Sequence, residues 1–163
     1  MNVDGRAWVF GDDINTDLLA PAPYLKGSMQ ELASHCLEDL DKDFAASVSE
    51  GDVFVAGENL GIGSSREQAP QALHMLGIRA VIAKSFGRIF YRNALNLGLP
   101  AFVCSEVDRI GKGDRLRVDA SSGTVENLTT GESFACEALP DHLVAMLSDG
   151  GLIPHLKKKL NEM

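Results

Sequence analysis

The sequence predicts one α/β domain with parallel strands at its centre. The apolar run 53–56, a helical pattern over 67–76 and a second apolar run over 79–83 follow one another closely, as in a βαβ unit. Short strand-like segments separated by glycine-containing turns come nearer the C-terminus. The chain has 163 residues, 45% of them hydrophobic, which suits one core of normal composition.

The elements before the βαβ unit are short. Residues 6–10 are predicted to form a first strand, and Gly-Asp-Asp at 11–13 a polar turn. Pro21 and Pro23 then interrupt the chain before a stretch of modest helical periodicity at 29–37. In the βαβ unit itself, the two strands should lie parallel and be joined by a right-handed crossover.

The elements after the βαβ unit alternate less regularly. A helix is predicted over 86–97, with Ser85 as its N-cap and Gly98 as its stop. Its inner face should contain Phe86, Ile89, Phe90, Asn93, Ala94 and Leu97. Further strands are expected at 101–103, 115–118, 124–127 and 133–136. A last helix over 139–147 precedes a C-terminal tail, residues 151–163. Apolar side chains of this tail are expected to dock on the domain or on a partner subunit: Leu152, Ile153 and Leu156.

The run from Gly57 to Pro70, Gly-Glu-Asn-Leu-Gly-Ile-Gly-Ser-Ser-Arg-Glu-Gln-Ala-Pro, is the main functional signal. Its glycines shape a turn between a strand and a helix, and they place Ser64, Ser65 and Arg66 near the helix start. Unpaired N–H groups at a helix start, together with an arginine fork, favour a carboxylate or phosphate. Such a place can also stabilise an ionised serine.

The same run has a purely structural interpretation. Ser64 and Glu67 fit the capping box Ser-x-x-Glu/Gln, as do Ser65 and Gln68 one residue later. Pro70 moves the expected helix start toward Glu67, because an interior proline removes a helix hydrogen bond. A nucleotide loop is not indicated, since neither the Gly-Lys-Ser/Thr ending nor Gly-x-Gly-x-x-Gly occurs here. Local chemistry therefore leaves a helix cap and an anion site open.

Composition excludes several classes of partner. The 15 basic and 23 acidic residues give a net charge of −8, which argues against nucleic acid or an anionic membrane. No apolar run approaches the roughly 18 residues that a membrane span needs. Residues 1–6 lack the basic-then-apolar plan of a signal peptide, so a cytoplasmic location is expected.

The three cysteines do not form a metal-binding pattern. Cys36, Cys104 and Cys136 are far apart in sequence and include no Cys-x-x-Cys pair. An iron–sulfur cluster normally needs three or four thiolates placed around it. We therefore expect reduced, partly buried thiols and no metal or cofactor bound by this chain.

Four segments, in the same order, resemble the swivelling domain of the aconitase superfamily. They are Asn15-Thr16-Asp17, Tyr24-Leu25-Lys26, the Gly-Ser-Ser-Arg-Glu loop at 63–67 and the junction 83–94. Within the superfamily, the chain is most similar to small subunits of the 3-isopropylmalate dehydratase and homoaconitase type. The resemblance implies one three-layer swivelling β/β/α domain over residues 1–163, with a central, largely parallel sheet.

The resemblance also implies a chemistry. These hydro-lyases remove water from a 2- or 3-hydroxy di- or tricarboxylate and add it back in the other orientation. Ser64 matches the family's base, while Ser65, Arg66, Lys26 and Asp17 match positions that bind or orient the substrate. A [4Fe–4S] cluster is then expected on a separate large subunit, and this chain alone is expected to be inactive.

Substrate identity stays open at this point. Lys26 stands where related small subunits often carry arginine, so the charge is kept and the planar fork is lost. The first expectation is 3-isopropylmalate, in leucine biosynthesis, with homoaconitate, citraconate or 2,3-dimethylmalate as alternatives. Two other classes remain: a non-catalytic module that binds a carboxylate or phosphate, and a structural partner.

Overall fold

The computed structural model describes residues 2–163, which share one seven-stranded sheet of order β4-β3-β2-β1-β5-β6-β7. The long strand β1 (Asn2–Val9) is common to its two halves. One half is parallel and consists of β1, β2 (Val53–Ala56), β3 (Ala80–Ala83) and β4 (Ala101–Val103). The other half is antiparallel and adds β5 (Arg115–Asp119), β6 (Thr124–Asn127) and β7 (Ser133–Ala135).

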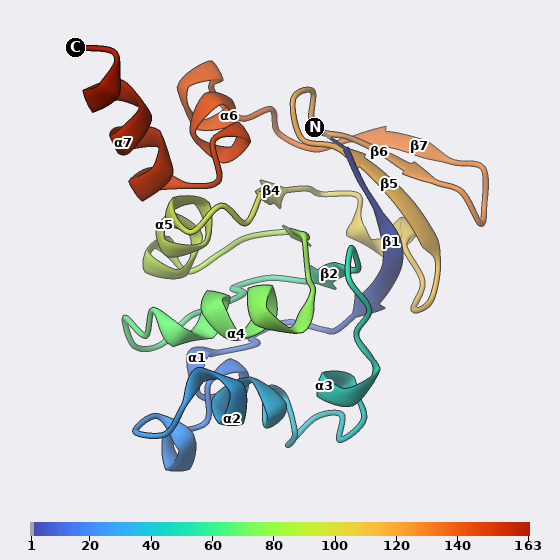
Figure 1. The fold of residues 1–163 in the computed structure, drawn as a ribbon. Coiled ribbons are helices and arrows are strands. Elements are labelled where there is room, and N and C mark those ends of the chain that lie inside the picture. Colours follow the sequence, from blue (N-terminus) through green and yellow to red (C-terminus); the bar gives the residue numbers. More distant parts are fainter. Residues whose placement is uncertain (1) are drawn as a thin grey trace.

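The helices are mostly short. They are α1 (Thr16–Leu19), α2 (Met29–Ser34), α3 (Phe44–Ser47), α4 (Gln68–Leu76), α5 (Arg88–Asn96), α6 (Asp141–Ser148) and α7 (Leu152–Asn161). Two 3-10 turns, η1 (Ala22–Tyr24) and η2 (Val107–Arg109), complete the set. Figure 1 shows α1, α2, α4 and α5 on one side of the parallel strands and β5–β7 on the other. The predicted α/β class with parallel strands at its centre is confirmed.

The predicted βαβ unit is confirmed closely. β2 pairs with β3 in parallel, from Val53 opposite Ala80 to Ala56 opposite Ala83. Every residue of both strands is buried, as expected of parallel strands covered on both faces. α4 between them begins at Gln68, one residue after the predicted start. The first strand begins earlier than predicted, because Asn2–Arg6 alternate exposed and buried positions opposite β5.

Two details of the helix predicted at 86–97 are wrong. α5 starts at Arg88, with Gly87 in the N-cap position and no side-chain cap. Ser85 therefore does not cap it: its Oγ accepts a hydrogen bond from the Asn59 N–H and donates one to Glu58, both at 2.8 Å. Ile89, predicted to face inward, is 44% exposed. Phe90 and Ala94 are buried as predicted, and Leu95, which was not predicted to face inward, is buried with them.

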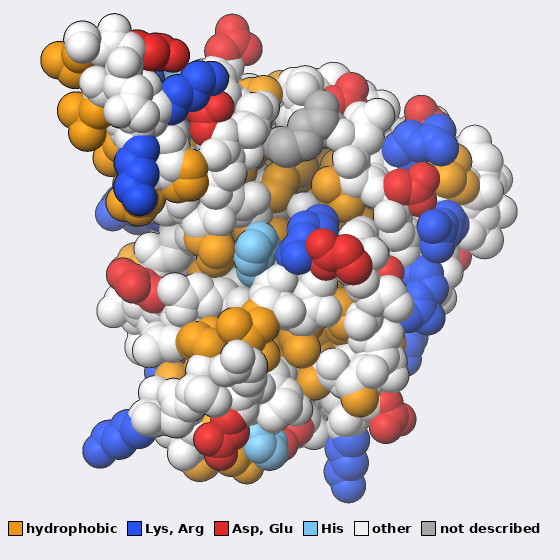
Figure 2. Space-filling view, viewed as in Figure 1, with side chains coloured by type: hydrophobic (Ala, Val, Ile, Leu, Met, Phe, Trp, Pro, Cys, Tyr) orange, Lys and Arg blue, Asp and Glu red, His pale blue; other side chains and the backbone are white. Residues whose placement is uncertain are grey.

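The C-terminal end is helical. The predicted tail contains α7, in which Leu152 packs against the core while Ile153 and Leu156 stay exposed. The docking expected for all three side chains is thus seen on this domain only for Leu152. Figure 2 shows apolar side chains at the surface of α7, at the upper left of the view. Across residues 2–163, no helix combines the length and apolar character that a membrane crossing needs.

Candidate active site

Three loops meet at the carboxyl ends of β1, β2 and β3. The loop after β2 lies in the middle and is joined by backbone hydrogen bonds to both neighbours. Gly61 N donates to Ile14 O at 2.6 Å, in the loop after β1. Leu60 N donates to Ser85 O at 3.0 Å, in the loop after β3. Three of the segments that carry the family resemblance therefore share one edge of the sheet.

Glycine is required in the central loop by close packing. Gly61 has a φ of +84°, and a Cβ there would lie 2.2 Å from Cγ of Phe90. A Cβ at Gly57 would lie 1.9 Å from an Asp12 carboxylate oxygen, and that oxygen accepts the Glu58 N–H at 2.7 Å. The loop conformation is thus fixed by contacts that a larger residue would block.

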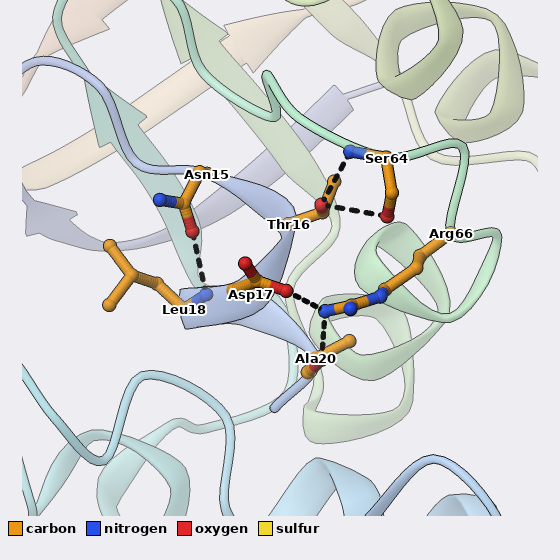
Figure 3. A network of polar contacts seen from close by, with 7 residues as sticks. All are labelled: Asn15, Thr16, Asp17, Leu18, Ala20, Ser64 and Arg66. Carbon is orange, nitrogen blue, oxygen red and sulfur yellow. Dashed lines mark hydrogen bonds and ion pairs between the residues drawn. The ribbon is translucent and has the colours of Figure 1, made fainter. Parts of the chain in front are cut away.

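Ser64 is exposed and contacts Thr16 on the neighbouring loop (Figure 3). Ser64 N donates to Thr16 Oγ1 at 3.2 Å, and the two hydroxyl oxygens are also 3.2 Å apart. Thr16 is 2% exposed, and its own N–H donates to Ile62 O at 2.9 Å. The serine thus lies at the surface, and its polar contact is to the buried hydroxyl of Thr16.

The helix-cap interpretation of the two serines is not what the structure forms. α4 begins at Gln68 with Glu67 in the N-cap position, and no side chain caps it. The Ser64 side chain instead contacts Thr16, across the gap between the loops. A side-chain cap of that kind does occur at α2, where Ser28 Oγ accepts the Glu31 N–H at 3.1 Å.

Arg66 and Asp17 are brought together by the fold. Arg66 Nη1 donates to Asp17 Oδ1 and to Ala20 O, the latter at 3.2 Å. The Arg66 side chain is 22% exposed and that of Asp17 is 69% exposed. The carboxylate thus holds one edge of a half-buried guanidinium at the border of the site.

Helix α1 positions two side chains for these contacts. Asn15 caps it, with Oδ1 accepting the Leu18 N–H at 2.9 Å. The first turn then presents Thr16 toward Ser64 and Asp17 toward Arg66, as Figure 3 shows. A four-residue helix thus carries the contacts to both Ser64 and Arg66 of the central loop.

Ser65 and Lys26 are not part of this hydrogen-bond network. Both are exposed, and neither side chain forms a hydrogen bond or ion pair within residues 2–163. Lys26 follows η1 on the loop that begins at Tyr24. The Tyr24 ring stacks on His35, with centroids 3.6 Å apart and planes 1° apart. The loop is therefore anchored at its tyrosine while its lysine faces solvent.

Glu38 secures the Tyr24–His35 stack. Its carboxylate lies 2.6 Å from His35 Nδ1. Desolvation raises the pKa of Tyr24, and the neighbouring Glu38 charge and hydrogen bond raise it further. A tyrosine hydroxyl is protonated at neutral pH in any case, and these effects act in the same direction.

Sequence reasoning overlooked Thr16, although the segment containing it was noticed. A threonine at a helix start is ordinarily a local structural residue, and its contact to Ser64 spans 48 positions of sequence. The available signal was Asn15, because an asparagine N-cap marks a helix start and so places Thr16 and Asp17 in the first turn. The Ala20 carbonyl that receives Arg66 carried no sequence signal.

All three cysteines are reduced and buried, more fully than predicted. Burial raises the pKa of the Cys36 thiol. Cys104 and Cys136 are brought together by the fold, and a hydrogen bond from Cys136 lowers the pKa of Cys104 to about 7. Within the described residues, no group of three or more His, Cys, Asp or Glu side chains is arranged to hold a metal ion.

The chain matches known proteins over nearly its whole length. Residues 26–105 match the family model described as the aconitase C-terminal domain. The 3-isopropylmalate dehydratase small subunit 1 of Thermotoga maritima is 47% identical over 158 residues, covering 96% of this chain and 95% of that protein. The 3-isopropylmalate dehydratase small subunit of Wolinella succinogenes is 50% identical over 162 residues, covering 98% and 97%.

Solved structures agree with the sequence relatives. The crystal structure of 3-isopropylmalate dehydratase from Methanocaldococcus jannaschii matches with a TM-score of 0.92 at 46% identity, covering 98% of this chain and 95% of that one. Aconitase X of Thermococcus kodakaraensis shares the fold at a TM-score of 0.51 and 16% identity. This chain therefore belongs to the family of 3-isopropylmalate dehydratase small subunits, within the proteins that carry an aconitase C-terminal domain.

Proposed function

We propose that this chain is the small subunit of a heteromeric hydro-lyase that isomerises a hydroxy acid by removing water and adding it back. The proposed substrate is 3-isopropylmalate, in leucine biosynthesis, because the relatives above carry that acid in their names. The observation that carries the proposal is the exposed Ser64 hydroxyl on the same loop as the half-buried Arg66 guanidinium.

Ser64 is assigned the role of base. A C–H group beside a carboxylate is a very weak acid, so its proton is removed only by a strong, desolvated base. A deprotonated Ser64 Oγ would take that proton and return it to the adjacent carbon when water is added back. A free serine hydroxyl is not ionised at neutral pH, so its oxyanion needs hydrogen-bond donors and positive charge nearby.

Arg66 is assigned to a substrate carboxylate. Asp17 and the Ala20 carbonyl occupy Nη1, while Nε and Nη2 form no hydrogen bond within residues 2–163. These two nitrogens point in parallel and suit the two oxygens of a carboxylate. Asp17 then acts by orienting the guanidinium, and the free Ser65 hydroxyl is assigned a hydrogen bond to the substrate.

A partner must complete this site. Ser64, Ser65 and Asp17 are exposed here, whereas a strong base needs a site closed to water. The relatives' names call them small subunits, which fits a larger partner. We propose that the partner carries a [4Fe–4S] cluster, which supplies the Lewis acid for the leaving hydroxide. The thiols of this chain do not fit that group, because they are buried and only Cys104 and Cys136 meet.

Reconstitution tests the proposal. We expect the purified chain and the purified large subunit, each assayed alone, to be inactive on 3-isopropylmalate. The two subunits together should interconvert 2- and 3-isopropylmalate. Turnover by the isolated chain, or no turnover by an assembled and iron-loaded complex, would contradict the proposed function.

The exposed Lys26 favours a second candidate substrate, a tricarboxylate of the homoaconitate kind. Its ammonium lies on an anchored loop without a protein partner among the described residues, and it could meet a distal carboxylate. A direct contact predicts that Lys26→Ala lowers kcat/KM for the tricarboxylate by roughly 30-fold or more, about 2 kcal/mol, and spares isopropylmalate. Equal, small effects on both acids would remove this candidate.

A further inference from the structure

We infer that Thr16 is the positioning residue that stabilises Ser64 in its deprotonated form, by donating its hydroxyl proton to Ser64 Oγ. The inference rests on the proposed function, in which Ser64 is the base. It goes beyond that function because it identifies the group that lets the serine hydroxyl ionise, and places that group on the buried side of the site.

Counting protons sets the direction of the hydrogen bond. The backbone N–H of Ser64 can only donate, so Thr16 Oγ1 accepts it at 3.2 Å and uses one lone pair. The Thr16 hydroxyl keeps its single proton for another acceptor, and Ser64 Oγ lies 3.2 Å away. Once Ser64 is deprotonated it has no proton to give, so Thr16 must be the donor. A hydrogen bond to an oxyanion is stronger than one between neutral hydroxyls, and the contact therefore favours the basic form.

Thr16 is held in place before any substrate arrives. The residue is 2% exposed, its N–H is bound to Ile62 O at 2.9 Å, and its carbonyl accepts the Ala20 N–H at 2.8 Å. A Cβ at Gly63 would lie 3.1 Å from Thr16 Oγ1, so the glycine leaves the hydroxyl room beside the serine. A donor fixed in this way needs no reorganisation when charge develops on its partner.

The Arg66 guanidinium is oriented away from Ser64. Arg66 Nη1 is bound to Asp17 and to the Ala20 carbonyl, and no Arg66 nitrogen hydrogen-bonds Ser64 within residues 2–163. Thr16 is also the side chain that contacts Ser64 Oγ in the described part of the chain. The two roles are therefore divided: Thr16 acts on the base, and Arg66 is left for the substrate.

Two substitutions separate the hydroxyl from the packing. Thr16→Val keeps the branched shape and removes the hydroxyl, whereas Thr16→Ser keeps the hydroxyl and removes only a methyl group. In the assembled complex with its large subunit, we expect Thr16→Val to lower kcat by about 10²–10³-fold with KM changed by less than about threefold. Thr16→Ser should recover kcat to within about tenfold of the wild type.

The pH profile gives a readout that a packing role would not move. Because the serine oxyanion loses a donor, the rising limb of kcat/KM against pH should shift to higher pH in Thr16→Val and stay in place in Thr16→Ser. In a Ser64→Ala background, Thr16→Val should cause no further loss, since both residues act on one step. Thr16→Ala replaces the valine variant in the same comparison if the latter does not assemble.

The outcomes distinguish the inference from the function on which it rests. If Ser64→Ala abolishes turnover while the assembled Thr16→Val complex keeps its kcat and pH profile, Ser64 is the base and the inference about Thr16 is wrong. If Ser64→Ala itself retains wild-type turnover, the proposed function fails first. Equal losses in Thr16→Val and Thr16→Ser would mean that packing, not the hydroxyl, matters.

Discussion

At the scale of single residues, Arg66 shows how one side chain can be both anchored and available. One terminal nitrogen is held by Asp17 and the Ala20 carbonyl, and the side chain is only 22% exposed. A guanidinium fixed at one edge presents the opposite edge in a defined direction. An ammonium group cannot satisfy the anchor and a bidentate carboxylate together.

Arg66→Lys should therefore weaken substrate binding while keeping the charge. We expect KM for the hydroxy acid to rise by about 10–100-fold, the equivalent of losing one or two hydrogen bonds to a charged group. Steady-state kinetics of the complex measures this. Arg79→Lys is the matched control, because Arg79 pairs with Glu50 at 2.8 Å on another part of the surface. An unchanged KM in Arg66→Lys would remove the arginine from the binding site.

His74 on α4 gives a residue-scale prediction for stability. Its pKa is lowered by burial and then by the charge of Arg79, so the folded chain favours the neutral imidazole. The unfolded chain binds the proton nearer the ordinary pKa of 6.5. This contribution to stability is therefore present above the unfolded pKa and is lost as the pH falls through the lower, folded pKa.

His74→Gln should accordingly flatten the acid loss of stability. Urea unfolding at about pH 7.5 and about pH 5.5 should show a larger drop in the free energy of unfolding for the wild type than for the variant. The exposed His142 on α6 provides the control, and His142→Gln should behave like the wild type. Identical drops in all three proteins would show that His74 does not couple folding to protons.

At the scale of elements, anchored loops do most of the positioning. The loop that carries Lys26 is held by the stack of Tyr24 on His35, the first residue after α2, and by Glu38 beyond it. An aromatic stack of this kind contributes about 0.5–1.5 kcal/mol beyond its burial. The stack therefore limits the region that the mobile end of Lys26 can reach.

Removing the stack should loosen this loop. We expect His35→Ala to lower kcat/KM of the complex by about 2–10-fold, in line with that energy, and to lower the melting temperature by a few degrees at most. His35→Phe should keep most of the activity, because a phenylalanine ring can still stack on Tyr24. Equal activity of His35→Ala and the wild type would mean that the position of this loop does not affect turnover of the substrate.

How well elements could be predicted depended on the range of the contacts that determine them. β2, β4 and β6 matched the predicted bounds, since short apolar or alternating runs between turns identify strands locally. The start of α5 did not match, because Ser85 is drawn to Asn59 and Glu58 on another loop.

The candidate site could likewise be predicted only where local sequence determines it. Ser64, Arg66 and Asp17 could be named from motifs, but the contact that joins Ser64 to Thr16 could not. It exists only because parallel strands bring the loops after β1 and β2 to one edge of the sheet. Local pattern therefore named the candidate groups, and the tertiary fold supplied their support.

At the scale of the whole molecule, the two halves of the sheet differ in their relation to the candidate site. The three loops that form the site follow strands of the parallel half. The antiparallel strands β5–β7 continue the sheet from the other edge of β1 (Figure 1). The site lies at an exposed edge rather than in an enclosed cavity of this chain. An exposed edge of this kind fits the proposal that this domain offers one wall of an active site and a partner offers the other.

Ser64 is proposed to be the base of a site shared between two subunits. The most direct test is Ser64→Ala in the complex with the large subunit, with kcat, assembly and melting temperature measured together. We expect kcat to fall by roughly 10²–10⁴-fold or more while assembly is intact and the melting temperature changes by less than about 4 °C. Near-normal kcat with a lowered melting temperature would contradict it, and would reduce Ser64 to a structural residue.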